Sequence, residues 1–268
     1  MPQQSIVTLT TDFGLADHFV ATMKGVMFGI NPLMTFVDIS HQVASHDVFD
    51  GALTLGFAYS YFPAGTIHLV VVDPGVGSSR RPIIARTAQH VFVAPDNGVL
   101  SLVYEREERA EVRQVTSEHY FLTPVSNTFH GRDVFAPVAA WLSKGVEISK
   151  FGDVITDYVR FVPPKPRRLE GGQIQGAVIK VDHFGNLLTN IGPGEAPGLF
   201  GSDPPHFRIA INGREITALY TSYSMAKPSE VFAIAGSVRL IEICQNRAAA
   251  AKTLNAVRGT EVGLVMVR

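Results

Sequence analysis

Cysteine is nearly absent from this chain of 268 residues, which contains only Cys244. No disulfide can therefore form within the chain, as is usual for proteins of reducing compartments. An isolated cysteine is most often a small apolar residue of the core, and we expect that role for Cys244.

An excess of charge of one sign is also lacking. The chain holds 23 Lys and Arg against 24 Asp and Glu, a net charge of −1, so nothing favours binding to nucleic acid or to an anionic membrane. No apolar run reaches the roughly 20 residues that a membrane span needs. The N-terminal MPQQSIVTLTTDF lacks the basic and apolar regions of a signal peptide. The sequence therefore predicts a cytoplasmic protein.

The first 162 residues alternate between strand and helix patterns. Strands are expected at residues 5–11, 33–39, 67–72, 82–87 and 90–95. Apolar spacing predicts helices at 19–30, with Asp17 as its cap, at 49–61, and just after residues 129–133. The third strand is apolar on both faces, as in a covered parallel sheet. We therefore predict an α/β layer domain with a mostly parallel central sheet, over residues 1–162.

The composition changes after residue 160. The segment FVPPKPRRLEGG is rich in proline and basic residues, so we expect a stiff linker at residues 163–172. Beyond it, residues 173–268 read mostly as short strands, with a hairpin at Asn212-Gly213 and one short helix at 248–254. This pattern predicts a smaller C-terminal β-barrel domain.

The glycine-rich segment VVVDPGVGSSRR, residues 70–81, follows the third strand. A phosphate loop is excluded, because the lysine and the spacing that it needs are missing. A dinucleotide or methyltransferase loop is a weak match, since its third glycine is replaced. A third interpretation is a carboxylate, Asp73, paired with Arg80 to orient another polar group. The plain alternative is a capped turn with solvated arginines.

Two other short segments carry candidate residues. Asp12 stands at the tip of the first strand, where a carboxylate can accept hydrogen bonds from both ribose hydroxyls, although an ordinary turn residue is equally compatible. A kinase site at Asp12-Phe13-Gly14 is excluded, because no kinase glycine loop, strand lysine or catalytic loop precedes it. His130 lies in FHGRD, just before a helix; a lone histidine is more often structural, and Arg132-Asp133 can simply pair.

Metal binding and the second half offer weaker signals. His41, His46, Asp47 and Asp50 match no standard ligand spacing, so no metal site is expected. In the segment DHFGN, residues 182–186, Gly185 is expected to bend the chain and leave the Asn186 amide free for a ligand; the alternative is a plain β-turn.

Six segments in this order give the chain a family resemblance: TTDFG, VVVDPGVGSSRR, APDNG, FHGRDVFAP, VDHFGNLLTNI and LIEICQN. The sequence resembles the S-adenosyl-L-methionine (SAM) hydroxide adenosyltransferases, or SAM hydrolases, relatives of fluorinase and chlorinase. The resemblance implies an N-terminal α/β domain, a C-terminal β-barrel and a homotrimer whose sites lie between subunits. It implies hydrolysis of SAM to adenosine and methionine, with SAM as substrate and no cofactor.

The resemblance also assigns residues. Asp73, Arg80 and His130 correspond to the catalytic set of the family. The substrate-binding residues that it implies are Asp12, Asp73, Asp182, Asn186, Tyr223, Ser237, Glu242 and Gln245. Asp12 would hold the ribose hydroxyls and Asn186 the nucleoside, Asp182 and Tyr223 would meet the methionine end, and the backbone near Gln245 would line the site.

The chain also departs from the halogenase pattern. The extra loop and the small hydroxyl residues of the halide site are missing, and Leu188 stands where fluorinase has a tryptophan. The departing group of SAM is a neutral thioether, so one cluster that positions a water molecule suffices for hydrolysis and no general acid is needed. A SAM or adenosine sensor without turnover, a methyltransferase and a halogenase remain the alternatives. Whether Arg80 or Arg81 faces the site is left open.

Overall fold

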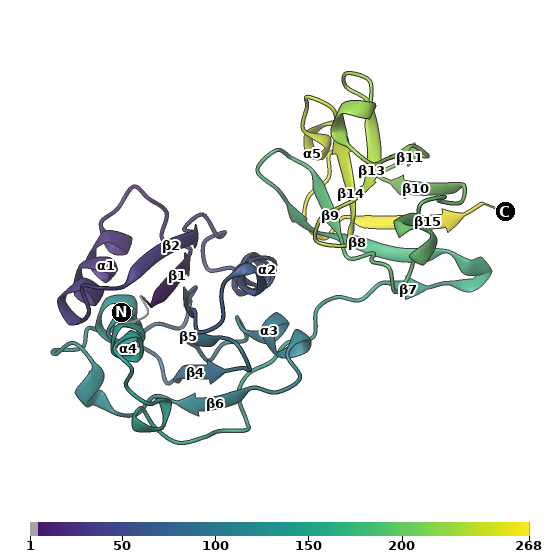
Figure 1. The fold of residues 1–268 in the computed structure, drawn as a ribbon. Coiled ribbons are helices and arrows are strands. Elements are labelled where there is room, and N and C mark those ends of the chain that lie inside the picture. The colour runs from purple at the N-terminus through teal and green to yellow at the C-terminus, as the bar shows by residue number, and fades with distance from the viewer. Residues whose placement is uncertain (1–4, 268) are drawn as a thin grey trace. The chain divides into compact units, whose positions relative to one another are not determined.

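The computed structural model describes residues 5–267 and divides into two compact units, Met1–Val162 and Pro163–Arg268 (Figure 1). Each unit has its own apolar core. Within the described residues, no helix is both long and apolar enough to cross a membrane.

The first unit is built on one six-stranded sheet with the order β2-β1-β3-β5-β4-β6. Its strands are β1 (Ile6–Thr11), β2 (Thr35–Ser40), β3 (Ile67–Val71), β4 (Pro82–Arg86), β5 (Val91–Pro95) and β6 (Glu111–Gln114). Strands β2, β1, β3 and β5 run parallel, while β4 is antiparallel to β5 and β6. All five residues of β3 are buried, as expected for a strand covered on both faces. The predicted mostly parallel α/β sheet is confirmed.

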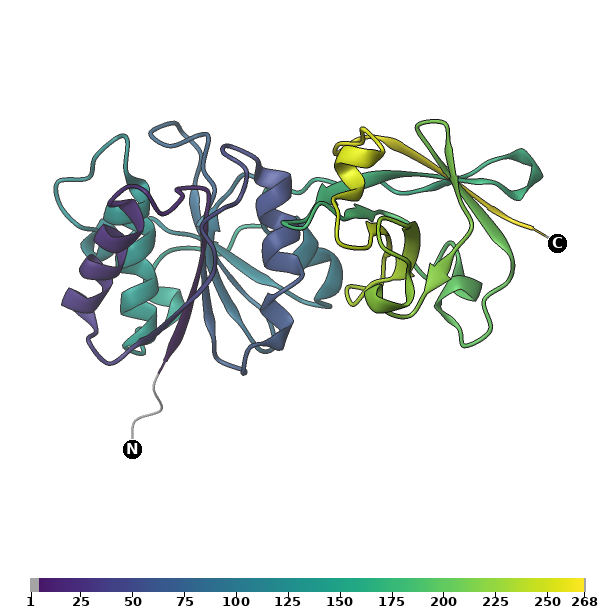
Figure 2. The same ribbon diagram turned by 90° about the horizontal axis from the view of Figure 1, so that it is seen from above.

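Helices cover both faces of this sheet (Figure 2). They are α1 (Phe19–Ile30), α2 (Val48–Gly56), α3 (Ser101–Arg106) and α4 (Ala136–Ser143). Helices α1 and α4 pack together on one face, and α2 and α3 on the other. The prediction that Asp17 caps α1 is wrong, because the residue at the cap is His18, which makes no side-chain cap hydrogen bond.

Helix α2 has a side-chain cap at its start and ends earlier than predicted. Asp47 caps it by accepting a hydrogen bond from the backbone N–H of Asp50, 3.0 Å away. The helix is shorter than predicted: it ends at Gly56, and a 3₁₀ turn, Tyr59–Tyr61, replaces its last turn. Tyr59, in this turn, is only 2% exposed and packs in the apolar core.

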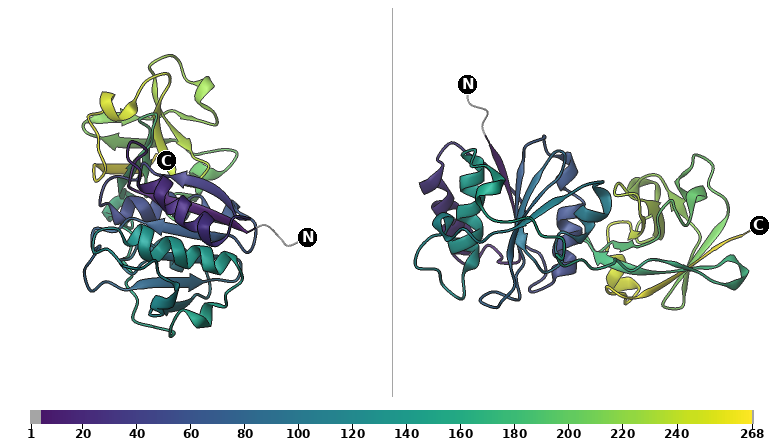
Figure 3. Two further views of the ribbon diagram at one scale, coloured as in Figure 1. Left: turned by 90° about the vertical axis from the view of Figure 1, so that its left-hand side faces the viewer. Right: turned by 90° about the horizontal axis from the view of Figure 1, so that it is seen from below.

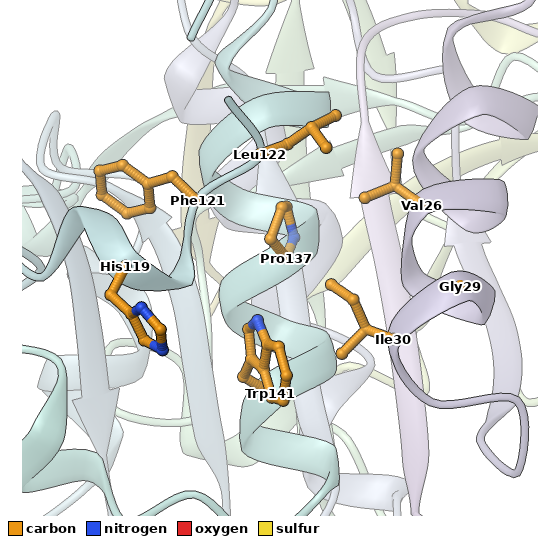
Figure 4. A pocket seen from close by; sticks show the side chains of 8 residues that line it. All are labelled: Val26, Gly29, Ile30, His119, Phe121, Leu122, Pro137 and Trp141. Atoms are coloured by element: carbon orange, nitrogen blue, oxygen red, sulfur yellow. The ribbon is translucent and has the colours of Figure 1, made fainter. Parts of the chain in front are cut away.

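A mostly apolar cavity of about 380 Å³ lies between α1 and α4. Figure 4 shows Val26 and Ile30 of α1 on one side of it and Pro137 and Trp141 of α4 on the other. No residue predicted to be functional lines this cavity, so it is separate from the candidate site.

The second unit is a single curled, mostly antiparallel sheet (Figure 3). Its strands are β7 (Arg167–Arg168), β8 (Ile174–Val181), β9 (Leu187–Thr189), β10 (Phe207–Ile211), β11 (Arg214–Ile216), β12 (Leu219–Tyr220), β13 (Val231–Ala235), β14 (Ile241–Gln245) and β15 (Glu261–Met266). One half of β8 pairs with β15 and the other half with β9, which lets the sheet curl into a half-barrel. The predicted small β-barrel domain is thus confirmed.

Two local features of this unit follow from its sequence. Asn212 and Gly213 adopt positive φ angles of 45° and 74° between β10 and β11, which makes the predicted hairpin. The short helix α5 (Ala250–Thr253) lies inside the predicted range 248–254. Arg167 and Arg168, within the expected linker, pair with β8 and so belong to this sheet.

Candidate active site

The glycine-rich turn after β3 folds back on itself. The backbone N–H of Val76 donates to the carbonyl of Asp73, and the Ser78 hydroxyl donates to the carbonyl of Gly75 over 2.6 Å. Gly77 has a φ of +76°, and a Cβ atom there would overlap the carbonyl oxygen of Asn127. The turn therefore requires glycine at this position, and it returns the chain toward Asp73.

Arg80 comes back from the turn and clamps Asp73. Its Nε donates to both carboxylate oxygens of Asp73 at 2.9 and 3.0 Å, and its Nη2 donates to Oδ2 as well. The two side chains are 9% and 5% exposed. The guanidinium also lies over the ring of Phe135, with 4.9 Å to the centroid. A buried, two-point ion pair with a ring beneath it holds the guanidinium in one orientation.

His130 completes the cluster predicted from the sequence. Its Nδ1 atom lies 2.7 Å from Nη2 of Arg80. A guanidinium can only donate, so Nδ1 accepts, and the proton of the neutral ring resides on Nε2. Burial, and then the positive charge of Arg80, lower the pKa of His130 below its ordinary value. The ring is therefore neutral near pH 7.

Arg81 points to a different part of the molecule. Its Nε and Nη2 donate to Asp96, and its Nη1 lies 2.8 Å from Asp157. Asp96 in turn accepts the backbone N–H of Val159 at 2.8 Å. Arg80 is thus the arginine that contacts Asp73, and Arg81 fastens the last residues of the first unit to its sheet.

A π-helical turn, Gly131–Phe135, begins directly after His130 and leads into α4. Such turns are rare and are frequent at functional sites. Asp133 is fully buried there; it accepts a hydrogen bond from Nε of Arg132 at 2.6 Å and one from the backbone of Ser126 at 2.8 Å. The pairing considered for Arg132 and Asp133 is therefore observed, and it fixes the segment that presents His130.

A small cavity of about 140 Å³ opens beside this cluster. Asp73 and His130 line it, and its other walls are mostly apolar. Three of those walls are the rings of Phe13, Phe19 and Phe129, whose centroids lie 5.2–6.0 Å apart. Polar interactions are strengthened in such apolar surroundings.

Asp12 directly follows β1 and precedes Phe13, which lines this cavity. Its Oδ2 atom accepts the backbone N–H of His46 at 2.8 Å. The chain behind it is held by a hydrogen bond of 2.7 Å from the N–H of Gly14 to the carbonyl of His41. One oxygen of the Asp12 carboxylate, Oδ2, is therefore held by a backbone hydrogen bond.

The second unit contains its own cavity, of about 600 Å³, and most of the residues predicted there line it. Its lining consists of Asp182, Phe184, Asn186, Tyr223, Gln245, Asn246, Arg247, Ala248 and Ala249. Sequence reasoning did not predict a role for Phe184 or Arg247. The Phe184 ring is 74% exposed, and Arg247 adopts a φ of +58°, which no local sequence pattern reveals.

Asp182 and Asn186 are tied together by the turn between β8 and β9. Oδ1 of Asp182 accepts the backbone N–H groups of Phe184 and Asn186, and Oδ2 accepts from the Asn186 side chain at 2.8 Å. Gly185 bends the chain as expected, with a φ of +84°. The Asn186 amide is free only in part, because Asp182 accepts one of its N–H groups; the other N–H and the carbonyl have no such contact with Asp182, so the role in ligand binding stays a prediction.

Three further predicted residues differ in their surroundings. Ser237 is exposed in the turn between β13 and β14 and does not line the cavity. Glu242 is 7% exposed, and burial, followed by the charge of Asp182, raises its pKa. The side chain of Gln245 is engaged internally, since it donates to the carbonyl of Ser229 and accepts from Thr253. These two contacts hold the Gln245 side chain in place beside the cavity.

Tyr223 links Glu242 to the cavity. Its hydroxyl lies 3.5 Å from Oε2 of Glu242, at the outer limit of a hydrogen bond. Burial is the main reason why the pKa of Tyr223 is raised to about 12. Cys244 is buried beside these residues, as expected, and burial raises its pKa too.

The residues considered for a metal have other partners. Among residues 5–267, no group of three or more His, Cys, Asp or Glu is arranged to hold a metal ion. His41 contacts Thr11 and Asp38, and Asp47 caps α2.

Comparison with known proteins gives matches over most of the chain. Residues 7–152 match the family model described as SAM hydroxide adenosyltransferase N-terminal domain, and residues 176–263 match the corresponding C-terminal domain. A protein of Salinispora tropica named (R)-S-adenosyl-L-methionine hydrolase is 41% identical over 68% of this chain and 70% of its own length. A protein of that name from Salinispora arenicola is 33% identical over 96% of both chains. A fluorinase from an Actinoplanes species is 30% identical over 69% of this chain and 71% of its own.

A solved structure is similar over nearly the whole length. The crystal structure of an uncharacterized conserved protein from Thermotoga maritima has a TM-score of 0.89 and 35% identity, and the match covers 97% of this chain and 99% of that one. The folds of both units are therefore shared with a protein of known structure.

Proposed function

Since the chain belongs to the SAM hydroxide adenosyltransferase family, we propose that it is a hydrolase that cleaves SAM into adenosine and L-methionine. Relatives of up to 41% identity carry the name (R)-S-adenosyl-L-methionine hydrolase. Within this chain, the observation that carries the proposal is the buried contact of Asp73, Arg80 and His130 beside a small, largely apolar cavity.

The reaction is a displacement at C5′ of the ribose. A bond forms between the oxygen of water and C5′, the C5′–S bond breaks, and its electron pair goes to sulfur, which leaves as the thioether of methionine. One proton of the water is released to solvent. Because the departing group is neutral, the site has only to place the water in line and polarise it.

Arg80 and His130 can supply that polarisation as donors. The Nε2–H of His130 has no hydrogen-bond partner in the described part of the chain, and neither does Nη1 of Arg80. Two donors aimed at one oxygen stabilise its hydroxide-like form. Nε2 of the neutral ring already carries a proton, so His130 does not act as the base through that nitrogen; Asp73 keeps the arginine in position.

The remaining residues are proposed to bind the substrate. Asp12 would hold the ribose hydroxyls, and Asn186 and the backbone near Gln245 the nucleoside. Asp182, Tyr223, Glu242 and Ser237 would surround the methionine end. SAM is the substrate, and the reaction as written needs no other cofactor.

We also propose a homotrimer in which each site takes its catalytic cluster from one subunit and its second cavity from the next. A mixing experiment tests this arrangement. Asp73→Ala damages only the first unit and Asn186→Ala only the second, so each variant alone should be inactive. In mixed trimers, some sites combine two undamaged halves, and activity should reappear. Continued inactivity of mixed trimers would place both halves in one subunit.

The names of the relatives further suggest a stereochemical preference. We propose that the chain acts on the epimer of SAM with the R configuration at sulfur. The two epimers can be separated and incubated singly with the protein; faster cleavage of the S epimer would contradict this point and leave the hydrolase assignment intact.

Product analysis after incubation with SAM is the decisive experiment. Adenosine and methionine support hydrolysis, S-adenosylhomocysteine would indicate a methyltransferase, and tight binding without turnover would indicate a sensor. Reactions in added fluoride or chloride test the halogenase alternative. The chain lacks the small hydroxyl residues of the halogenase halide site, so halogenated nucleoside should not be the main product.

A further inference from the structure

A chain of polar contacts runs beside Asp12, and its members are not part of the site described above. It consists of Lys24 in α1, Asp38 in β2, His41 after β2 and Thr11 at the end of β1. His41 is 4% exposed and Thr11 is fully buried. Because polar groups are costly to bury, a connected set of them next to a predicted binding residue calls for an explanation.

The contacts form a continuous line. Nζ of Lys24 lies 2.6 Å from Oδ2 of Asp38, and Nε2 of His41 lies 3.0 Å from Oδ1. The second contact has the distance of an ion pair, although the N–H is not aligned for a hydrogen bond. On the other side of the ring, Nδ1 of His41 lies 2.9 Å from the hydroxyl oxygen of Thr11.

The hydrogen bonds at Thr11 give this line a direction. Its hydroxyl oxygen accepts the backbone N–H of Phe13 at 3.3 Å. Its own hydrogen can be donated to Nδ1 of His41, and in that tautomer the ring proton is on Nε2, the nitrogen that lies 3.0 Å from Oδ1 of Asp38. The line of contacts therefore runs from the ion pair between Lys24 and Asp38, at the edge strand β2, to the backbone N–H of Phe13, the residue after Asp12.

Backbone pairing with β2 does not hold this end of β1. The register between β1 and β2 shifts after Leu9, and the last registered pair joins Thr10 to Ser40. Thr11 has no partner in β2. On its other side, Thr11 pairs with Val71 of β3. The side-chain contact between Thr11 and His41 therefore adds to the backbone contacts at the point where the chain turns toward Asp12.

The segment that carries His41 also holds the Asp12 loop by its backbone. The carbonyl of His41 accepts the N–H of Gly14, and the N–H of Val43 donates to the carbonyl of Thr11 at 3.4 Å. Oδ2 of Asp12 itself accepts the N–H of His46. The loop after β1 and the loop after β2 therefore hold each other at several points. The His41 ring makes the contact at Thr11, and the Asp12 carboxylate makes the contact at His46.

We propose that His41, backed by Asp38, is a positioning residue that aims the free oxygen of Asp12 at the ribose diol. This inference rests on the proposed function, which brings an adenosyl group to Asp12. Loss of the contact would let the loop turn and would weaken the recognition of the diol, while groups that bind the rest of the nucleoside would remain in place.

A pair of ligands isolates this effect. Binding of adenosine and of 2′,3′-dideoxyadenosine is measured by calorimetry, and the ratio of their affinities reports on the diol alone. Hydrogen bonds to a carboxylate should give the wild type a preference for adenosine of at least about tenfold. Asp12→Ala should abolish that preference. His41→Ala and Asp38→Asn should reduce it at least about threefold and leave dideoxyadenosine affinity nearly unchanged.

Matched variants separate positioning from general damage. Lys24→Ala removes the other partner of Asp38 and should keep the preference, whereas His41→Asn, which retains a polar group at the Nδ1 position, should restore part of it. In the double variant Asp12→Ala/His41→Ala, the second change should have no further effect. If His41→Ala proves unstable, Thr11→Val tests the same contact with a smaller change.

Three results would overturn the inference: an equal loss of affinity for both ligands in His41→Ala and Asp38→Asn, an unchanged preference in both, or a wild type that does not prefer adenosine. Binding is measured without turnover. A wild type that discriminates between the ligands but leaves SAM intact would therefore refute the hydrolase proposal while the positioning role stands.

Discussion

Nη2 of Arg80 donates to Nδ1 of His130 across 2.7 Å, and this contact decides which ring nitrogen carries the proton. The same guanidinium holds Asp73 through Nε and Nη2. The three residues therefore act as one unit in which the arginine is central.

Replacement of Arg80 by lysine should lower kcat by about 100-fold or more. An ammonium group cannot make the two-point contact with Asp73 and also reach His130 with fixed geometry. The neighbouring Arg81→Lys is the matched control: it should keep most of the activity, and its cost should fall on stability, because Arg81 binds Asp96 and Asp157. Steady-state kinetics and thermal denaturation of both variants check this. Equal kinetic losses at the two positions would contradict the assignment of Arg80.

The activity should fall in acid with a midpoint below the ordinary histidine pKa of about 6.5. Burial and Arg80 lower the pKa of His130, so the ring stays neutral until the pH falls below that value. Once protonated, Nδ1 no longer accepts from Arg80 and the cluster opens. The pH profile of kcat/KM measures the midpoint. A midpoint at or above 6.5 would show that another group controls the acid limb.

Folding stability should also decrease in acid because of a histidine remote from the site. His68 is fully buried, and desolvation lowers its pKa to about 3. The unfolded chain binds the proton with a pKa of about 6.5, so stability from neutral His68 is complete above that pH and is lost as the pH falls. The loss should be about 2 kcal/mol between pH 6.5 and 5.

His68→Asn tests this slope, since it retains a polar group near the hydroxyl of Thr8, which lies 2.7 Å from Nδ1 of His68. Denaturant unfolding at several pH values gives the free energy of unfolding, and only its change with pH is compared, so the cost of the smaller side chain cancels. The variant should lose less stability than the wild type on acidification. An unchanged slope would assign the acid sensitivity to other groups.

Gly77→Ala should both destabilise the first unit and reduce activity. A Cβ atom at this position would overlap the carbonyl of Asn127, so the turn that returns Arg80 must move. Gly65→Ala is the control, because Gly65 also has a positive φ, +85°, but nothing lies within 4 Å of its Cβ position. That control should cost only about 1 kcal/mol of backbone strain. Similar losses of stability and activity in both variants would exclude the steric explanation.

Much of the fold follows from the sequence because local patterns and tertiary packing agree. The buried strand at Ile67–Val71 and the hairpin at Asn212-Gly213 are examples, since each has a pattern that few other structures satisfy. The helix begins at Phe19, as predicted, so the residue at its cap is His18 and Asp17 lies one residue too early to cap it. The apolar pattern predicted the start of the helix, whereas the presence of an acidic residue nearby did not identify the cap.

The site was less accessible to sequence reasoning. Asp73, Arg80 and His130 could be named, but the choice between Arg80 and Arg81 depends on how the chain leaves a turn of several residues. The engagement of Asn186 by Asp182 and the line from Asp38 to Thr11 are likewise tertiary contacts. Spacing along the chain does not encode such contacts, since side chains three to thirty residues apart meet only after folding.

The two adjacent arginines also constrain how this site could change. Arg80 is fastened on one side to Asp73 and Arg81 on the other to Asp96. A single-residue deletion between Asp73 and Arg80 would move Arg81 into the place of Arg80, and a single-residue insertion would put Ser79 there, so that neither arginine would occupy that place. The length of this loop is therefore a stricter requirement than its composition, and redesign of the nucleophile site should substitute residues within the loop while keeping its length.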